Sequence, residues 1–166
     1  EFRRVLFRSH PLGSRFEEMD AVVVFEDVRV PWENVLLYRD VERCNTAYAR
    51  TGAAANMAHQ VVVKNIAKSE FVLGLAHLLV DAIGAEVFQH VQEKLAEIWV
   101  TLETMRALLR AAEADATPDE FGVFRPAWNP LDAARNLFPR LYPRMVEILQ
   151  QIGASGLVAK IGRAHV

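Results

Sequence analysis

Between residues 88 and 112, apolar side chains recur at alternating spacings of three and four residues. The positions are Phe88, Val91, Leu95, Ile98, Leu102, Met105, Leu109 and Ala112. Such spacing places every one of them on the same side of an α-helix, and it is typical of the shallow packing of a four-helix bundle. The pattern therefore predicts a helix here with one buried face.

A second helix is predicted over residues 53–84, which are dense in alanine, lysine, glutamate and leucine and close at Gly84. From residue 71 to residue 80, apolar side chains cover nearly the whole circumference of this helix. A helix that is apolar on all sides is buried on several sides. The centre of a bundle and a subunit interface both satisfy this pattern.

A third helical region starts at Leu131, after a long connection over residues 115–130. Pro139 and Pro143 each remove a backbone donor. We therefore expect a break near Phe138 and a fresh helix that runs to Ile152.

Residues 20–38 are rich in valine and are predicted to be extended, with Pro31 where a strand ends and Glu26–Asp27 at a turn or bulge. One ribbon is too little sheet to be stable alone. We expect this ribbon to complete a sheet whose other strands lie upstream.

The length of 166 residues corresponds to about one domain, and the 52% hydrophobic and 24% charged fractions are ordinary for a globular chain. A net charge of −2 with interspersed signs gives no reason to expect nucleic acid or an anionic membrane as a partner. The longest apolar stretch is too short to span a membrane. The single cysteine, Cys44, excludes an internal disulfide and has no partner at metal-ligand spacing. These features predict a soluble, cytoplasmic protein without a metal site.

The two ends look foreign to the rest. Residues 1–9, EFRRVLFRS, and residues 160–166, KIGRAHV, resemble translated sequencing-adaptor sequence. We expect both to be non-native and the chain to be a piece of a longer protein.

The stretch Gly153, Ala154, Ser155 and Gly156 follows an apolar helix. Glycine commonly ends a helix because it adopts the left-handed conformation at no steric cost. Glycine also permits a ligand to approach the backbone closely. The residues alone leave both interpretations open, and one position can satisfy both.

Several stretches resemble one family. "FEDVRVPWENVL", residues 25–36, resembles the strand that enters the helical domain of acyl-CoA dehydrogenase-like flavoproteins. "HPLGSRFEEMDA", residues 10–21, and "LDAARNLFPRLYPRMVEILQQIGASGL", residues 131–157, are similar to the large component of 4-hydroxyphenylacetate 3-monooxygenases, as is "HVQEKLAEI", residues 90–98. The resemblance implies a mainly α fold, with residues 10–38 ending a middle β domain and residues 39–159 forming the C-terminal four-helix bundle.

The family resemblance also implies an activity. A separate flavin reductase supplies reduced FAD, which reacts with O₂ so that a phenol is hydroxylated ortho to its hydroxyl group. Gly153, Ala154, Ser155 and Gly156 are then expected to contact FAD. For Gln150, both an assisting contact with FAD and a solvated surface position stay open. The catalytic residues belong to upstream domains, so none is assigned here. The implied assembly is a homodimer or homotetramer.

Three alternatives stay open at this point. An acyl-CoA dehydrogenase-type flavoenzyme shares the fold, and so does an iron–sulfur 4-hydroxybutyryl-CoA dehydratase. The dehydratase needs a histidine and a cysteine about two turns apart, whereas Ile66 lies two turns after His59. A non-catalytic helical oligomerisation module is the third.

Two further sets of residues are weaker candidates for the site. Arg135, Arg140 and Arg144 are long enough to reach a pyrophosphate, but a solvated or salt-bridged face is the more common role of such residues. A histidine such as His59 can serve in acid–base chemistry, yet a single histidine on a bundle helix is usually structural.

Overall fold

The computed structural model describes residues 22–163, without the side chains of Ser155 and residues 158–163. The expectations for residues 1–9, for residues 10–21 and for the last three residues lie outside this part of the chain. The chain divides into two units, residues 1–40 and 41–166. Each unit is described by itself below.

The described part of the first unit contains a single short element, the 3₁₀ helix η1 (Trp32–Asn34). The strands predicted over residues 20–38 are not formed between residues 22 and 40. The predicted turn is present, since the backbone bends at Glu26–Asp27 and Asp27 has a φ of 45°. The physical reason is that a strand is stabilised by hydrogen bonds to a neighbouring strand, and the described residues of this unit provide none.

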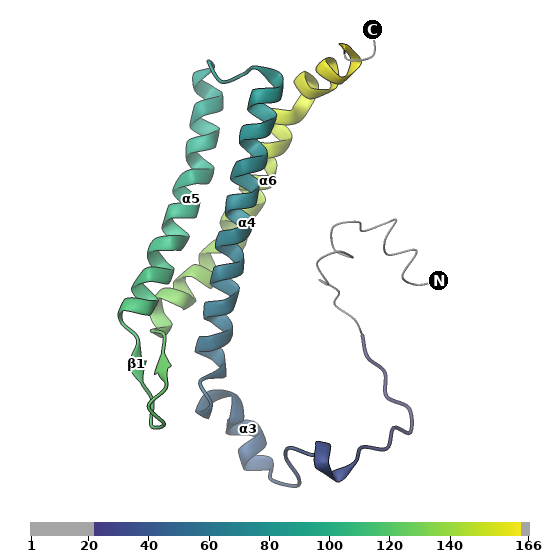
Figure 1. Ribbon diagram of the computed structural model, residues 1–166, viewed down its shortest axis with the longest axis vertical. Coiled ribbons are helices and arrows are strands. Elements are labelled where there is room, and N and C mark those ends of the chain that lie inside the picture. Colours follow the sequence, from purple (N-terminus) through teal and green to yellow (C-terminus); the bar gives the residue numbers. More distant parts are fainter. Residues whose placement is uncertain (1–21, 164–166) are drawn as a thin grey trace. The chain divides into compact units, whose positions relative to one another are not determined.

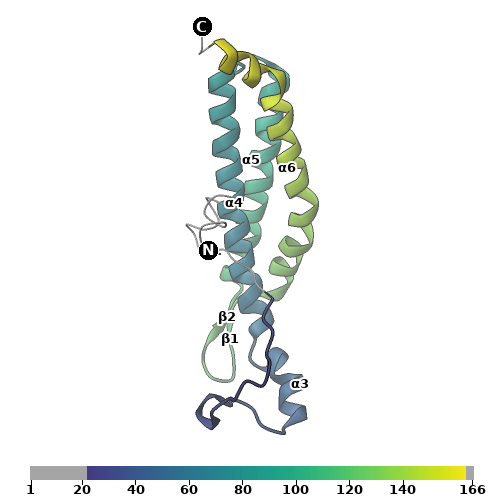
Figure 2. The ribbon, with the colours of Figure 1, turned by 90° about the vertical axis from the view of Figure 1, so that its right-hand side faces the viewer.

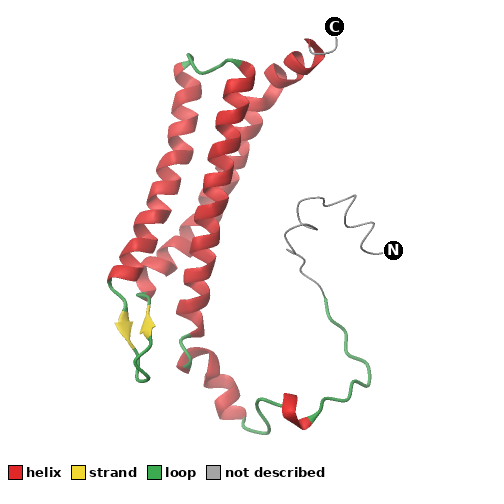
Figure 3. Ribbon diagram, viewed as in Figure 1, coloured by secondary structure: helices red, strands yellow, loops and turns green. Residues whose placement is uncertain are grey.

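The second unit is helical, as the sequence predicts (Figures 1 and 3). Its elements are α3 (Val41–Arg50), α4 (Ala53–Ile83), α5 (Gln89–Ala114), the strands β1 (Thr117–Pro118) and β2 (Phe124–Arg125), and α6 (Trp128–Arg163). The long helices α4, α5 and α6 run antiparallel in chain order and all pack on one another, while α3 packs on α4 (Figures 1 and 2). This is the bundle architecture expected for the mainly α fold.

The α4 helix ends where the sequence predicts. Gly84 caps it with a φ of 72°, and its N–H donates to the carbonyls of Val80 and Asp81. The turn to α5 is short, so the C-terminal end of α4 and the N-terminal end of α5 lie at the same end of the bundle.

The apolar seam predicted for α5 faces the core. Six of its eight positions are buried, Leu109 is half-buried, and Phe88 is exposed at the N-cap. The side chain of Phe88 escapes burial because the residue precedes the first helical turn.

The connection over residues 115–130 contains an antiparallel hairpin, with Thr117 paired to Arg125 and Pro118 to Phe124. The short sheet of this protein therefore lies between α5 and α6 in the described residues, and not in the N-terminal ribbon. Arg125 fixes the hairpin, since its guanidinium donates to Asp119 at 2.9 Å and to the carbonyl of Arg50 at 3.2 Å. The second bond ties the hairpin to the end of α3.

The break predicted near Phe138 is wrong, because α6 continues through Pro139 and Pro143. Both prolines are exposed, so the lost backbone hydrogen bonds lie on the solvent side. The opposite side of the helix is held by buried Phe138 and Met145. Packing of that face offsets the cost of the prolines.

The core consists of two clusters along the bundle. One lies toward the α4–α5 turn and includes Val80, Ile98 and Ile148. The other lies toward the hairpin and includes Met105 and Leu131. Ile66 and Tyr142 pack against both clusters, which makes the core continuous.

Candidate functional site

The helix α6 is interrupted at Ala154, where φ is −16° and ψ is −128°. Helical backbone precedes and follows this residue. The interruption falls within the stretch 153–156 that the sequence singles out as a helix end. The break divides α6 into two helical segments that meet at Ala154.

An open groove of about 470 Å³ lies beside this interruption. It is formed by the end of the α4–α5 turn, the first turns of α5 and the end of α6. Its lining residues are Ala85, Phe88, His90, Val91, Lys94, Gln151, Ile152, Ala154 and Gly156. We call this site the kink groove.

Of the four residues predicted to bind a cofactor, Ala154 and Gly156 line the kink groove. Gly153 is turned toward α4, since a Cβ atom there would lie 3.9 Å from Leu79 Cδ1. A Cβ atom on Gly156 would lie only 3.1 Å from Ile83 Cγ2, so packing already favours glycine at this position. The side chain of Ser155 lies outside the described residues.

The described lining of the kink groove carries a lysine and a histidine but no carboxylate. Lys94 is half-buried and His90, one turn earlier on α5, is exposed. The groove therefore combines positive charge with apolar walls. Such a combination suits an anionic ligand that also has an apolar part.

Sequence reasoning missed His90, Lys94 and Gln151. The feature that could have revealed them is the antiparallel order of the helices. In that order, the N-terminal end of α5 and the C-terminal end of α6 lie at the same end of the bundle. A spacing of four residues then places His90 and Lys94 on the same face of α5.

The weaker candidates lie elsewhere. Arg144 Nε donates to Glu97 Oε1 at 2.8 Å, and the guanidinium also pairs with Glu147 at 2.9 Å. These bonds, first to Glu97 and then to Glu147, raise the pKa of Arg144. Arg135 lies over the ring of Trp128, 5.7 Å from its centroid. The predicted salt-bridged face is confirmed for Arg144.

His59 is also engaged in a structural contact. Its Nε2 lies 2.8 Å from Glu113 Oε1, which joins α4 to α5. The interpretation as a structural histidine is consistent with this bond. His59 does not line the kink groove.

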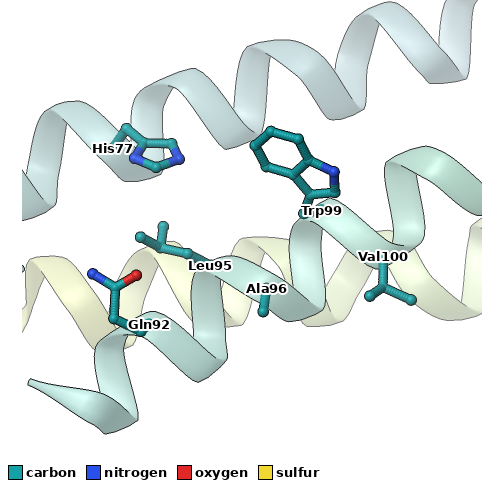
Figure 4. A pocket seen from close by; sticks show the side chains of 6 residues that line it. All are labelled: His77, Gln92, Leu95, Ala96, Trp99 and Val100. Atoms are coloured by element: carbon teal, nitrogen blue, oxygen red, sulfur yellow. The ribbon is translucent and has the colours of Figure 1, made fainter.

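A second groove, of about 340 Å³, lies between α4 and α5. Its lining residues are His77, Gln92, Leu95, Ala96, Trp99 and Val100 (Figure 4). The Trp99 side chain is 54% exposed although it is a large apolar group. Large exposed apolar surface is typical of an interface with another chain.

Within residues 22–163, no group of three or more histidine, cysteine, aspartate or glutamate side chains is arranged to hold a metal ion. None of the described helices combines the length and the apolar character that a membrane crossing requires.

The fold and its comparisons identify the class of the protein. The antiparallel bundle is the C-terminal helical domain of the acyl-CoA dehydrogenase-like fold. It matches the solved oxygenase component of 4-hydroxyphenylacetate 3-monooxygenase complexed with FAD and 4-hydroxyphenylacetate, with a TM-score of 0.80 and 58% identity over 90% of this chain and 31% of that one.

The family follows from the sequence match. Residues 44–160 match the family described as 4-hydroxyphenylacetate 3-hydroxylase C terminal, and the chain belongs to this family. It is 58% identical to the 4-hydroxyphenylacetate 3-monooxygenase oxygenase component of Thermus thermophilus, over 90% of this chain and 31% of the relative. It is 52% identical to the corresponding component of a Geobacillus species, over 90% of this chain and 30% of the relative. The chain thus spans about a third of the length of these relatives.

Proposed function

We propose that this chain is the C-terminal helical part of an oxygenase component that hydroxylates a phenol such as 4-hydroxyphenylacetate with reduced FAD and O₂. One observation carries the proposal: a groove whose described lining has a lysine and a histidine but no carboxylate adjoins the break at Ala154, in a chain 58% identical to such a component. Membership of the oxygenase family also favours this function over the acyl-CoA alternatives.

The role of this part of the enzyme is to bind and orient the flavin. The residues present fit the group, because the small residues Ala154 and Gly156 leave backbone accessible on one wall and Lys94 supplies positive charge on another. Phe88, Val91 and Ile152 add apolar surface that excludes water. Reduced FAD supplies the electrons with which one atom of O₂ enters the aromatic ring and the other leaves as water. We assign no catalytic residue to this chain.

A chimera tests the proposal directly. The full-length oxygenase component of Thermus thermophilus would carry residues 44–160 of this chain in place of its own matching region. We expect the chimera to bind FAD and to hydroxylate 4-hydroxyphenylacetate within about tenfold of the parent rate, which corresponds to about 1.4 kcal/mol. A folded chimera that binds no FAD would overturn the proposal.

The kink groove is tested by filling it. Ala154→Trp places a large side chain in the groove, so we expect FAD affinity to fall by at least tenfold. Ala133→Trp is the matched control, since Ala133 is exposed on the same helix and does not line the groove. Equal FAD affinity in the two variants would remove the groove from the flavin site.

We also propose that the enzyme is a homodimer or homotetramer assembled through this bundle. Phe71 and Leu78 on α4 and Trp99 on α5 are 64%, 67% and 54% exposed, which supports a further covering chain. In the chimera, Leu78→Glu is expected to lower the mass measured by sedimentation, whereas Val123→Glu on the hairpin is not. An unchanged mass in Leu78→Glu would argue against an interface at this face.

The partner reaction and the compartment complete the proposal. A separate reductase supplies reduced FAD, so chemically reduced FAD should support hydroxylation by the chimera without any reductase. Failure under that condition would mean that the reductase contributes more than flavin.

A single cysteine supports a reducing, cytoplasmic location, which fractionation of the source cells would test.

A further inference from the structure

Two basic side chains stand one turn apart on the α5 wall of the kink groove. They are His90 and Lys94, and both line the same groove as Ala154 and Gly156. The groove therefore has two basic side chains on its α5 wall and two small residues on its α6 wall. This arrangement goes beyond the four residues on which the flavin site was predicted.

Lys94 is distinctive because the nearby acidic groups are already engaged. Glu97, one turn along α5, accepts bonds from Arg144 on both carboxylate oxygens, at 2.8 and 3.2 Å. Glu93 accepts a bond from Gln89 at 2.9 Å. In the part of the chain that the structure describes, no hydrogen bond or ion pair involves Lys94.

A half-buried lysine without a carboxylate partner is available to an anion from outside the chain. The rest of the groove narrows the choice of anion. Phe88, Val91 and Ile152 give it apolar surface, so a ligand that carries both phosphate and a flat apolar group fits better than a small free anion. A nucleoside diphosphate carries both of these groups.

We infer that Lys94, assisted by His90, binds the diphosphate group of FAD in the kink groove. This inference rests on the proposed function and names side chains of the flavin site on a helix far in sequence from residues 153–156. Lys94 acts here as a binding residue, and it has no part in oxygen transfer.

The test compares ligands with and without the diphosphate. In the chimera described above, affinities for FAD, ADP and riboflavin would be measured by fluorescence and calorimetric titration. Lys94→Met is expected to weaken FAD and ADP by about tenfold, the scale of one charge-assisted hydrogen bond, and to leave riboflavin unchanged. Lys94→Arg keeps the charge and should retain most of the affinity. Lys64→Met is the matched control, because Lys64 is exposed on α4 and does not line the groove.

The outcomes separate the two proposals. If the unsubstituted chimera binds no FAD, the proposed function and this inference both fail. A second case is that the unsubstituted chimera binds FAD, but Lys94→Met lowers the affinities for FAD and riboflavin equally or changes neither affinity. In that case only the assignment of Lys94 to the diphosphate is overturned. A less steep dependence of FAD affinity on NaCl in Lys94→Met than in Lys64→Met would support the assignment. Lys94→Gln, with far-ultraviolet circular dichroism, provides a second variant if Lys94→Met does not fold.

Discussion

Arg144 on α6 and Glu97 on α5 form a two-bond contact between the guanidinium and the carboxylate, with donor–acceptor distances of 2.8 and 3.2 Å. The contact joins two helices that are separated in the sequence by the long connection over residues 115–130. Because Arg144 occupies both oxygens of Glu97, the first carboxylate after Lys94 in the sequence is not free to pair with Lys94. One ion pair thus influences both the packing of the bundle and the charge of the kink groove.

The first prediction concerns this competition. Arg144→Met releases Glu97, which can then pair with Lys94 three residues earlier on the same helix. We expect FAD affinity in the chimera to fall by about twofold, the scale of one such helical pair. Adding Glu97→Gln should restore the affinity, as measured by the same titration. A loss that persists in the double variant would show that Arg144 acts in another way.

The second prediction concerns the core. Ile98 is fully buried in the cluster near the α4–α5 turn. Ile98→Ala should lower the free energy of unfolding by about 2–5 kcal/mol, because it removes buried methyl groups and leaves a cavity. Urea unfolding measures this change. Val100→Ala, at a side chain 64% exposed two residues later, should stay within about 0.5 kcal/mol of the unsubstituted chain.

The third prediction uses two glycines with nearly the same backbone. Gly84 has a φ of 72° and open space around it, whereas Gly52 has a φ of 68° and a Cβ atom there would lie 2.7 Å from Arg125 Nε. Gly84→Ala should cost about 1–2 kcal/mol for its left-handed conformation alone. Gly52→Ala should cost about 1 kcal/mol more, because Arg125 must move. Urea unfolding gives both values.

Arg125 supplies the control for that comparison. In an Arg125→Ala background, the extra cost of Gly52→Ala should disappear, since the crowding atom is gone. If the extra cost remains, the contact with Arg125 is not its source.

The fourth prediction is a dependence on pH. Partial burial acts to raise the pKa of Asp119, but hydrogen bonds from the backbone N–H groups of Val123 and Phe121 and from the Arg125 guanidinium outweigh it, so the pKa is lowered. A lowered pKa in the folded state stabilises the protein above the unfolded pKa, which is about 3.9 for aspartate. This stabilisation is lost as the pH falls through the folded pKa.

Asp119→Asn should therefore lower the Tm at pH 7, and the difference from the unsubstituted chain should shrink below about pH 4. Thermal melts at a series of pH values, from pH 7 to below about pH 4, measure this difference in Tm. Glu120→Gln, at the exposed next residue, is the control and should run parallel to the unsubstituted chain. A constant difference for Asp119→Asn at every pH would contradict the role of its charge.

The helices of the bundle were predictable because their signals are local. The spacing from Val91 to Ala112 defines the buried face of α5, and Gly84 ends α4 in the left-handed conformation that glycine favours. The stretch around Ala154 was likewise predicted as a helix end, and α6 is interrupted there.

The errors concern long-range relationships. Pro139 and Pro143 interrupt the hydrogen bonding of an isolated helix, but only the tertiary structure shows that both lie on the solvent side of α6. The extended ribbon was predicted as strands from its valines, although strand formation depends on partners that propensity does not reveal. Lys94 was missed as a site residue because it belongs to the groove only when α5 and α6 meet.

The two exposed prolines of α6 have a consequence for how the bundle assembles. A helix that lacks internal hydrogen bonds at Pro139 and Pro143 is poorly stable by itself. The hairpin of α4 and α5 has no proline and joins its helices through a short turn, so it can form early from local contacts. The middle of α6 then becomes helical as it docks, and protection of its amides from hydrogen exchange should report docking onto α4 and α5 rather than local helix stability.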